Sequence, residues 1–271
     1  MVKIEISRQS LKVMHYVEII GSTPLELISI PGGSFQMGAP KTETGSKDLE
    51  RPQHPVEIQP FFLGRYPITQ AQWQAVAQLK KVEIELEPAP SNFTGDQYPV
   101  EQVNWFEAKE FCARLSRLSD RDYRLPTDAE WEYACRAGTT TPFHFGETIT
   151  TNLANYDGRE TYDRGPKGEY RRTTTPVDRF GIANPFGLSD MHGNVWEWCE
   201  DDWHETYDGA PKDGNAWIDN ESDRSNIRKV IRGGSWSNAP WYCRSAFRGR
   251  YNPDNRHFSL GFRVARSAPR T

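Results

Sequence analysis

Three stretches of the chain carry apolar residues at helical spacing behind a residue that can cap a helix. In each stretch a Thr or Asn is followed three residues later by Gln or Glu, at Thr69–Gln72, Asn104–Glu107 and Thr127–Glu130. This pairing is the capping box, which satisfies free backbone amides at a helix N-terminus. The pattern predicts three helices. The second places Cys112 on its buried face, and the third ends at Gly138.

Alternating apolar and polar residues indicate strands before the first of these helices. The stretch LELISIPGGSFQMG (25–38) predicts a hairpin around its Pro-Gly-Gly turn, and HPVEIQPFFLGRYPIT (54–69) predicts further extended chain. From residue 139 onward, frequent Gly, Pro, Asn and Asp residues predict long ordered loops. We therefore expect an α+β fold with few regular elements. One domain covers 21–271 and follows a helical or extended lead-in segment at 1–20.

Composition narrows the classes of partner. The chain has 271 residues, of which 36% are hydrophobic and 12% aromatic, and its net charge is −4. This charge argues against a nucleic-acid surface, which needs a cationic excess. No apolar run approaches the roughly 20 residues that span a bilayer, so no membrane insertion is expected. The N-terminus lacks the pattern of a secretory signal. We expect a cytoplasmic protein with reduced thiols, because its four cysteines form no C-x-x-C pair.

The stretch GGSWSNAPWYCRSAFRGRYNPDNRHFSLGFR (233–263) combines aromatic and arginine residues with one cysteine, Cys243. The cysteine suggests redox chemistry, whereas the aromatic and arginine content suggests a binding surface. The six histidines include no pair at helical metal-ligand spacing, and GGSWS lacks the last glycine of a nucleophile elbow. These residues alone identify no general acid or base.

Four ordered motifs resemble the formylglycine-generating, or sulfatase-modifying, family. They are IPGGSFQMG (30–38), YRLPTDAEWEYACRAG (123–138), GLSDMHGNVWEWCEDDW (187–203) and RGGSW…CRSAFR…GFRVA (232–265). The resemblance covers residues 20 to 267 and implies a variant of the C-type lectin fold. The family includes copper-dependent oxidases that convert a cysteine to formylglycine, domains attached to other enzymes, and ligand-binding proteins without catalysis. The fold therefore leaves the activity open.

The resemblance allows a residue-by-residue test for the oxidase. Catalytic members carry two copper-binding cysteines, five residues apart, after the GGS-aromatic turn. Counted forward from Gly234, these positions fall on Asn238 and Cys243, so one thiolate is missing. Counted backward from GFR, Cys243 falls on no catalytic position. We expect no copper and no catalytic residue, and we interpret Cys243 as a small core residue.

The resemblance also implies structural calcium at two sets of residues. The family's second calcium set corresponds to Asp190, Gly193, Val195 and Glu197. Its first set corresponds to Asn155, Tyr156, Glu169 and Arg171, with a Glu where the family has an Asp. Carboxylate and carbonyl oxygens are ligands that suit calcium.

The C-terminal segment further resembles the variable proteins of diversity-generating retroelements. In those proteins adenine-directed mutagenesis rewrites AAC codons between fixed residues, and fixed positions here would include Trp236, Arg244 and Phe262. The expected ligand-binding residues between them are Ser237, Asn238, Ala239, Trp241, Tyr242, Phe247, Gly249, Arg250, Tyr251, His257, Phe258 and Ser259. All of these types except Trp can be reached from AAC by changing adenines only, so Trp241 needs another template codon.

Three functions remain open from the sequence. The favoured one is a non-catalytic protein that binds a protein or another macromolecule through an exposed surface at 237–259, since its composition is that of antibody paratopes. A second is a catalytically inactive family member whose aromatic residues pack in the core. The third is a formylglycine-generating oxidase or a related enzyme.

Overall fold

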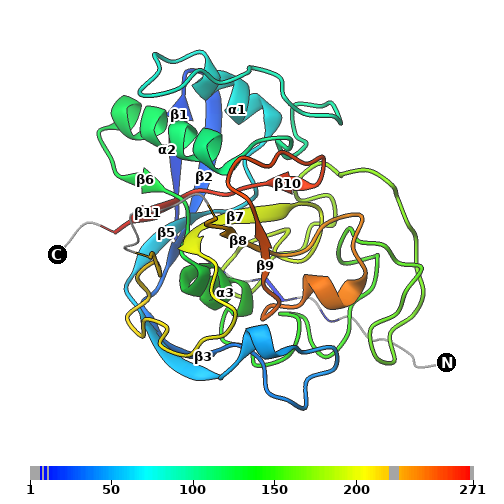
Figure 1. Ribbon diagram of the computed structural model, residues 1–271. Helices are drawn as coiled ribbons and strands as arrows, with labels where there is room; N and C mark the ends of the chain where they lie inside the picture. The colour runs from blue at the N-terminus through cyan, green and yellow to red at the C-terminus, as the bar shows by residue number, and fades with distance from the viewer. Residues whose placement is uncertain (1–6, 8, 11, 220–225, 269–271) are drawn as a thin grey trace.

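A computed structural model describes residues 7, 9–10, 12–219 and 226–268. Its strands form three sheets (Figure 1). The five-stranded sheet has the order β1 (His15–Ile20), β2 (Thr23–Ile30), β5 (Phe61–Gly64), β11 (Ala265–Ser267) and β6 (Tyr123–Arg124). The four-stranded sheet has the order β10 (Leu260–Gly261), β7 (Trp196–Asp202), β8 (Lys229–Arg232) and β9 (Gly249–Tyr251). The two-stranded sheet pairs β3 (Gly33–Met37) with β4 (His54–Ile58).

The three predicted helices are confirmed, together with their caps. They are α1 (Gln70–Ala77), α2 (Trp105–Ser119) and α3 (Asp128–Arg136). At each N-terminus the predicted Thr or Asn side chain accepts a hydrogen bond from the amide three residues on, and the capping box is complete. Helix α3 ends at Arg136, and it is followed by the left-handed capping residue Ala137 and then by Gly138. Cys112 is buried as predicted.

The predicted hairpin within 25–38 is wrong. β2 pairs with β1 and β5, whereas β3 pairs with β4. The first hairpin instead turns at Gly21, which has a positive φ of 63°, and aligns Ile20 with Thr23. Alternation identifies a strand but not its partner, so the turn residues alone could not decide the pairing. Residues 15–20 of the lead-in segment are consequently part of the five-stranded sheet.

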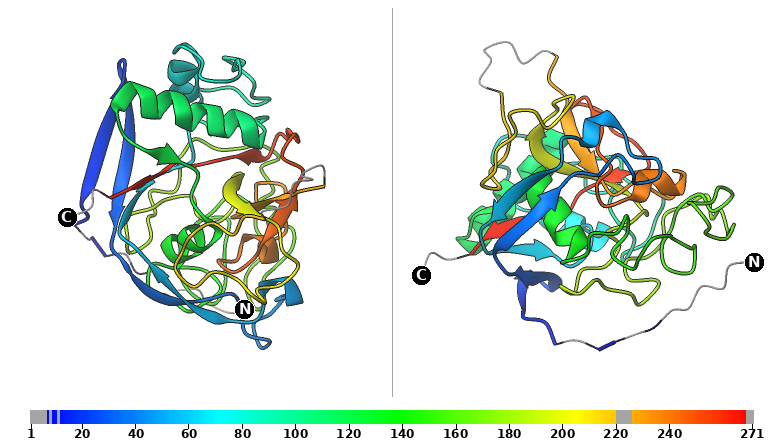
Figure 2. Two further views of the ribbon diagram at one scale, coloured as in Figure 1. Left: turned by 60° about the vertical axis from the view of Figure 1, so that its left-hand side comes forward. Right: turned by 90° about the horizontal axis from the view of Figure 1, so that it is seen from below.

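Two main cores fill the molecule. The first packs α1 and α2 against the hairpin of β1 and β2, which stands at one side of the molecule (Figures 1 and 2). The second packs α3 between the two-stranded sheet and the four-stranded sheet. Residues 137–195 contain no helix or named strand, which confirms the predicted long loops. None of the described helices is long and apolar enough to cross a membrane.

Phe262 joins the C-terminal motif to the first core. Its side chain is 0% exposed, and its ring lies 5.2 Å from that of Phe111 and 6.1 Å from that of Trp73. Truncation of a buried phenylalanine typically costs about 3–5 kcal/mol, because apolar contacts are lost and a cavity remains. We expect Phe262→Ala to lower the free energy of unfolding, measured by denaturant titration, by about 3–5 kcal/mol.

Phe106→Ala is the matched control for this prediction. Phe106 lies on α2 with 45% of its surface exposed, so its truncation should change the free energy of unfolding by about 0.5 kcal/mol or less. Equal effects of the two substitutions would contradict the assignment of Phe262 to the core.

Candidate functional site

The C-terminal segment leaves β8 through two glycines that the geometry requires. Gly233 and Gly234 have positive φ angles of 90° and 70°. A Cβ atom on Gly234 would lie 2.6 Å from Sγ of Cys243, so only glycine fits. The chain then forms the 3₁₀ helix η2 (Pro240–Cys243), turns into β9 beside β8, and returns to β10. Within this segment β9 forms one edge of the four-stranded sheet, and β10, which follows it, forms the opposite edge.

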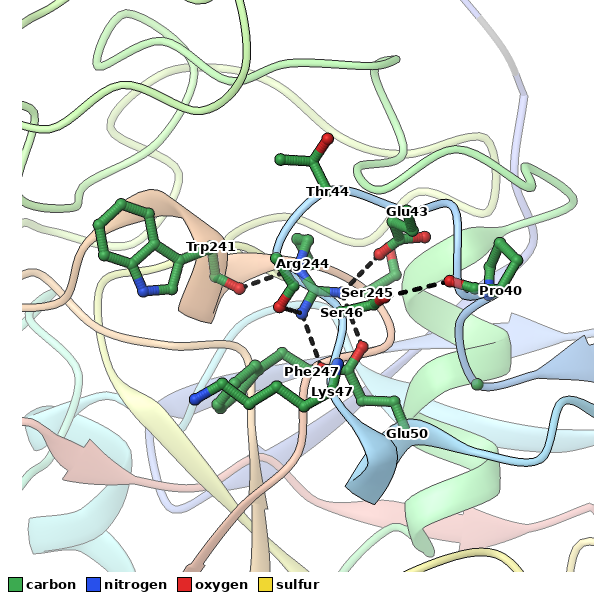
Figure 3. Close-up of polar contacts among 12 residues, drawn as sticks. Pro40, Glu43, Thr44, Ser46, Lys47, Glu50, Trp241, Arg244, Ser245 and Phe247 are labelled. Atoms are coloured by element: carbon green, nitrogen blue, oxygen red, sulfur yellow. Dashed lines mark hydrogen bonds and ion pairs between the residues drawn. The ribbon is translucent and has the colours of Figure 1, made fainter.

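Arg244 ties this segment to the loop at residues 40–50 (Figure 3). Its guanidinium is buried and forms ion pairs with Glu43, at 2.5 Å, and with Glu50, at 2.7 Å. It also donates hydrogen bonds to the carbonyl oxygens of Gly45 and Trp241, each at 3.1 Å. The paired carboxylates raise the pKa of Arg244, although burial alone would lower it. Two nitrogens of Arg244 bind the two carboxylate oxygens of Glu50. Such bidentate pairing holds the loop in one position and balances the buried charge.

A second anchor is Asp128, the first residue of α3. One of its carboxylate oxygens accepts from Nε of Arg232 and the other from Nε of Arg248, the latter at 2.9 Å. Arg248 also binds the carbonyl oxygens of Leu49 and His204, at 3.0 and 3.2 Å. The two arginines lower the pKa of Asp128 against the opposing effect of burial. The C-terminal segment is therefore held by buried ion pairs at both Arg244 and Arg248.

Ten of the twelve expected ligand-binding residues reach the surface at least in part. Phe258 is exposed, and nine others are half-buried: Ser237, Asn238, Ala239, Trp241, Tyr242, Gly249, Arg250, Tyr251 and His257. Trp236 and Phe262 of the fixed frame are buried, as are Arg244 and Arg248. We call the ten residues that reach the surface, Phe258 and the nine half-buried ones, the binding face.

The expectation that Phe247 and Ser259 belong to an exposed surface is wrong, because both are buried, at 4% and 3% exposure. The Phe247 ring packs against Trp196 at 5.9 Å and edge-on against Tyr242 at 4.9 Å. The hydroxyl of Ser259 hydrogen-bonds Nδ1 of His257 at 2.8 Å, while its carbonyl oxygen accepts from the amide of Trp196 at 2.8 Å. The buried side chains of Phe247 and Ser259 thus contact Tyr242 and His257 of the binding face.

Three residues from distant loops extend the binding face. Phe93 and Tyr170 pack on Trp236, with ring centroids 5.5 and 6.0 Å from it. Lys47, which is exposed, places its ammonium group 5.7 Å from the ring centroid of Tyr242. None of the three lies near 237–259 in the sequence, and no local motif marks them. Only the folded chain brings them to this surface.

The copper positions do not form a two-thiolate site. Oδ1 of Asn238 accepts a hydrogen bond from the hydroxyl of Ser235 at 2.5 Å, and the backbone N–H of Asn238 donates to the Ser235 carbonyl at 3.1 Å. Cys243 is 0% exposed, and burial raises the pKa of its thiol. A neutral buried thiol is a poor copper ligand and a poor nucleophile. Within the described residues, no three His, Cys, Asp or Glu side chains are grouped to hold a metal ion.

The second expected calcium set fits a cation poorly. Glu197 accepts hydrogen bonds from Arg263 on both carboxylate oxygens, at 2.6 and 2.8 Å, and from Nε1 of Trp131 at 2.7 Å. Its charge is therefore already balanced by a buried arginine. Oδ2 of Asp190 accepts from the amide of Asp178 at 2.8 Å, and burial raises the pKa of Asp190 to about 6. Gly193 and Val195, which lie between these two residues in the sequence, are buried.

The first expected calcium set fits better through Asn155. The Asn155 amide nitrogen donates to the carbonyl of Thr173 at 2.9 Å and to Oδ1 of Asn194 at 3.1 Å. Oδ1 of Asn155 is buried and accepts no hydrogen bond from the described residues. Such an oxygen suits a hard cation. Tyr156 beside it is buried, whereas the exposed Glu169 pairs with Arg171 at 3.0 Å.

Comparison with known proteins identifies the domain. A family model described as "Sulfatase-modifying factor enzyme 1-like domain" matches residues 20–268. Serine/threonine-protein kinase pkn1 of Chlamydia caviae is 30% identical over 266 residues, which are 89% of this chain but only 38% of that kinase. The inactive C-alpha-formylglycine-generating enzyme 2 of Bos taurus is 26% identical, covering 94% of this chain and 92% of the relative. The formylglycine-generating enzyme of Mycobacterium tuberculosis is 30% identical, covering 88% and 96%.

Two solved structures share the fold over nearly the whole chain. PvdO from Pseudomonas aeruginosa is 33% identical with a TM-score of 0.79, covering 96% of this chain and 100% of PvdO. Treponema denticola variable protein 1 is 25% identical with a TM-score of 0.72, covering 95% and 100%. The expected C-type lectin-like fold of the formylglycine-generating type is thereby confirmed, as is the resemblance to a variable protein. The chain belongs to the family of the sulfatase-modifying factor enzyme 1-like domain.

Proposed function

We propose that this protein is a non-catalytic ligand-binding protein of the variable type and that residues of the binding face contact a protein or another macromolecule. The observation that carries the proposal is the contrast within one segment. Side chains such as Tyr251 and Phe258 reach the surface, whereas Arg244 and Arg248 of the same segment are buried in ion pairs. A rigid frame with half-exposed aromatic residues binds at a low cost in side-chain entropy.

Two further observations support this function over catalysis. Asn238 stands where the catalytic family members carry a copper-binding cysteine, and its side chain is held by Ser235. The fold likeness to Treponema denticola variable protein 1 extends over the whole frame that carries the face. We also propose a cytoplasmic location, which the four buried free thiols support.

The oxidase is the second candidate, since the 30% identical relative from Mycobacterium tuberculosis is a formylglycine-generating enzyme. We expect the purified protein, supplied with Cu(I) and oxygen, to leave the cysteine of a Cys-x-Pro-x-Arg peptide unoxidised. The physical reason is that one buried thiol cannot supply the two-sulfur site. Mass spectrometry of the peptide gives the result, and Cys243→Ser is the control. Peptide oxidation that is lost in Cys243→Ser would make the protein an enzyme.

A second test concerns tolerance to substitution. We expect simultaneous replacement of Ser237, Ala239, Arg250, Tyr251, His257 and Phe258 by Asn or Ser to keep a cooperative thermal transition. Surface substitutions typically change stability by about 0.5 kcal/mol or less each. Trp236→Ala is the contrasting variant. Trp236 is only 6% exposed, so its truncation should lower the free energy of unfolding by about 3–5 kcal/mol. If the six-fold variant unfolds while Trp236→Ala melts normally, the segment is core and the inactive-enzyme interpretation replaces this one.

We further propose that structural calcium binds at Asn155. A cation that binds only the folded chain stabilises it by mass action. We expect excess EGTA to lower the melting temperature of the wild-type protein, and Asn155→Ala to melt at the lower temperature with or without EGTA. Glu197→Gln should retain the EGTA response, because Arg263 already occupies that carboxylate. An unchanged wild-type melting curve, with no calcium found by elemental analysis, would exclude the site.

A further inference from the structure

Glu101 is a fully buried carboxyl group without a paired cation. Within the part of the chain that the structure describes, four glutamates are 0% exposed: Glu50, Glu101, Glu132 and Glu197. The other three each form an ion pair with a buried arginine. Among the described residues, no charged side chain acts on Glu101. Burial of a carboxyl group without an opposite charge costs free energy, so its retention needs a physical reason.

The Glu101 side chain holds the loop at residues 91–95. Its Oε1 accepts a hydrogen bond from the amide of Phe93 at 2.9 Å. The Glu101 amide donates to the hydroxyl of Ser91 at 3.1 Å, and the carbonyl of Phe93 accepts from Nε2 of Gln70 at 2.6 Å. Because Phe93 belongs to no helix or strand, side chains fix both of its polar backbone groups.

Phe93 connects this contact to the binding face. Its half-buried ring packs edge-on against Trp236, with ring centroids 5.5 Å apart. The Trp236 ring lies at the same distance from the ring of Phe258, and its Nε1 donates to the Phe258 carbonyl at 3.3 Å. A shift of the Phe93 backbone would therefore change the packing beneath Phe258 of the binding face.

The neighbouring Gln102 makes a second contact with the binding face. Its amide donates to the carbonyl of His257 at 3.0 Å, and its φ of 63° lies in the left-handed region that glycine favours. Such a conformation costs free energy in other residues and persists where the surrounding structure requires it. Two unfavourable features thus occur at adjacent residues, where the chain supports the binding face.

The titratable side chains around this segment leave Glu101 without an electrostatic partner. Glu107 of α2 pairs with Arg256 at 3.0 Å, and Nδ1 of His257 contacts Oγ of Ser259 at 2.8 Å. Asp96, next to the loop at 91–95, is exposed. None of these groups shifts the pKa of Glu101.

The charge of Glu101 therefore changes in the neutral pH range. Burial raises the pKa of Glu101 to about 7, against the opposing effect of the Phe93 and Asn92 amides. An ionised carboxylate accepts a hydrogen bond more strongly than a neutral carboxyl group. The contact with the Phe93 amide is thus strongest above about pH 7 and weakens as the pH falls through that value.

We propose that Glu101 is a positioning residue of the binding face, whose carboxylate holds the Phe93 amide and thereby keeps the Phe93 ring against Trp236. That this ring borders a ligand rests on the proposed function, whereas the hold of Glu101 on Phe93 does not. The loop at 91–95 is accordingly held more tightly when Glu101 is ionised than when it is protonated.

The first test needs no ligand, so its failure and that of the proposed function are independent. The Phe93 amide is followed by NMR in full-length protein between about pH 5.5 and 8.5, a range that spans the pKa of Glu101. We expect its proton resonance to shift with a midpoint near pH 7 in the wild type, and to stay constant in Glu101→Gln, which keeps the acceptor oxygen but cannot ionise.

Two controls accompany this titration. The Gly64 amide, which donates to the Val264 carbonyl at 2.8 Å, is the internal reference and should not titrate with this midpoint. Asp96→Asn removes an exposed carboxyl group near the same loop and should keep the Phe93 titration. A Phe93 resonance that does not titrate, or that titrates alike in Glu101→Gln, would overturn the proposal.

The second test removes the acceptor. In Glu101→Met the Phe93 amide should exchange with solvent about tenfold faster, as loss of one hydrogen bond implies, whereas Glu101→Gln should retain the wild-type rate. The indole resonance of Trp236 should move in Glu101→Met only, and that of Trp131, which is bonded to Glu197 at 2.7 Å, should stay in place. Unchanged exchange in Glu101→Met, or faster exchange without movement of the Trp236 resonance, would refute the positioning role. If Glu101→Met does not fold, the titration in the wild type and Glu101→Gln decides alone.

Discussion

Buried arginine–carboxylate pairs are the interaction on which the rest of this structure depends. Arg232, Arg244, Arg248 and Arg263 are essentially inaccessible to solvent, and each pairs with a carboxylate. Each guanidinium also donates to backbone carbonyls, as Arg263 does to Gly64, Arg65 and Ser189. Loops buried without such donors would leave carbonyl oxygens unsatisfied. A chain with few strands and long loops thus replaces part of its missing backbone ladder with side-chain donors.

These pairs do more for the arrangement of loops than for net stability. Removing two charges from water costs several kcal/mol per ion, and their attraction repays this only with good geometry and additional hydrogen bonds. Asp128 meets this condition, because its two oxygens bind separate arginines and its amide donates to Asp201 at 2.8 Å. Removal of either partner would strand a buried charge, at a cost of about 3–5 kcal/mol. The network therefore favours one loop arrangement over alternatives that would leave a charge unpaired.

The parts of this structure that the sequence predicted are those governed by local contacts. Thr69, Asn104 and Thr127 cap helices through residues three positions away, so each capping box was visible in the sequence. Strand pairing depends on residues that are far apart in the chain, so the Pro-Gly-Gly turn wrongly predicted a hairpin between β2 and β3. The burial of Phe247 could not be foreseen either, because the ring packs on Trp196, about 50 residues away. Motif resemblance supplied the fold where local patterns could not.

The location of the arginine partners explains how a surface can vary on this frame. Glu43, Glu50 and Asp128 all lie outside residues 237–259, and the ion pairs that they form with Arg244 and Arg248 do not involve the half-exposed side chains of the binding face. Phe93 and Tyr170, which flank the face, are likewise supplied by other loops. A substitution at Tyr251 or Phe258 changes the chemistry of the surface but removes no group that takes part in these ion pairs. Because buried arginines hold the segment and other residues form its surface, the surface residues can change while the frame stays the same.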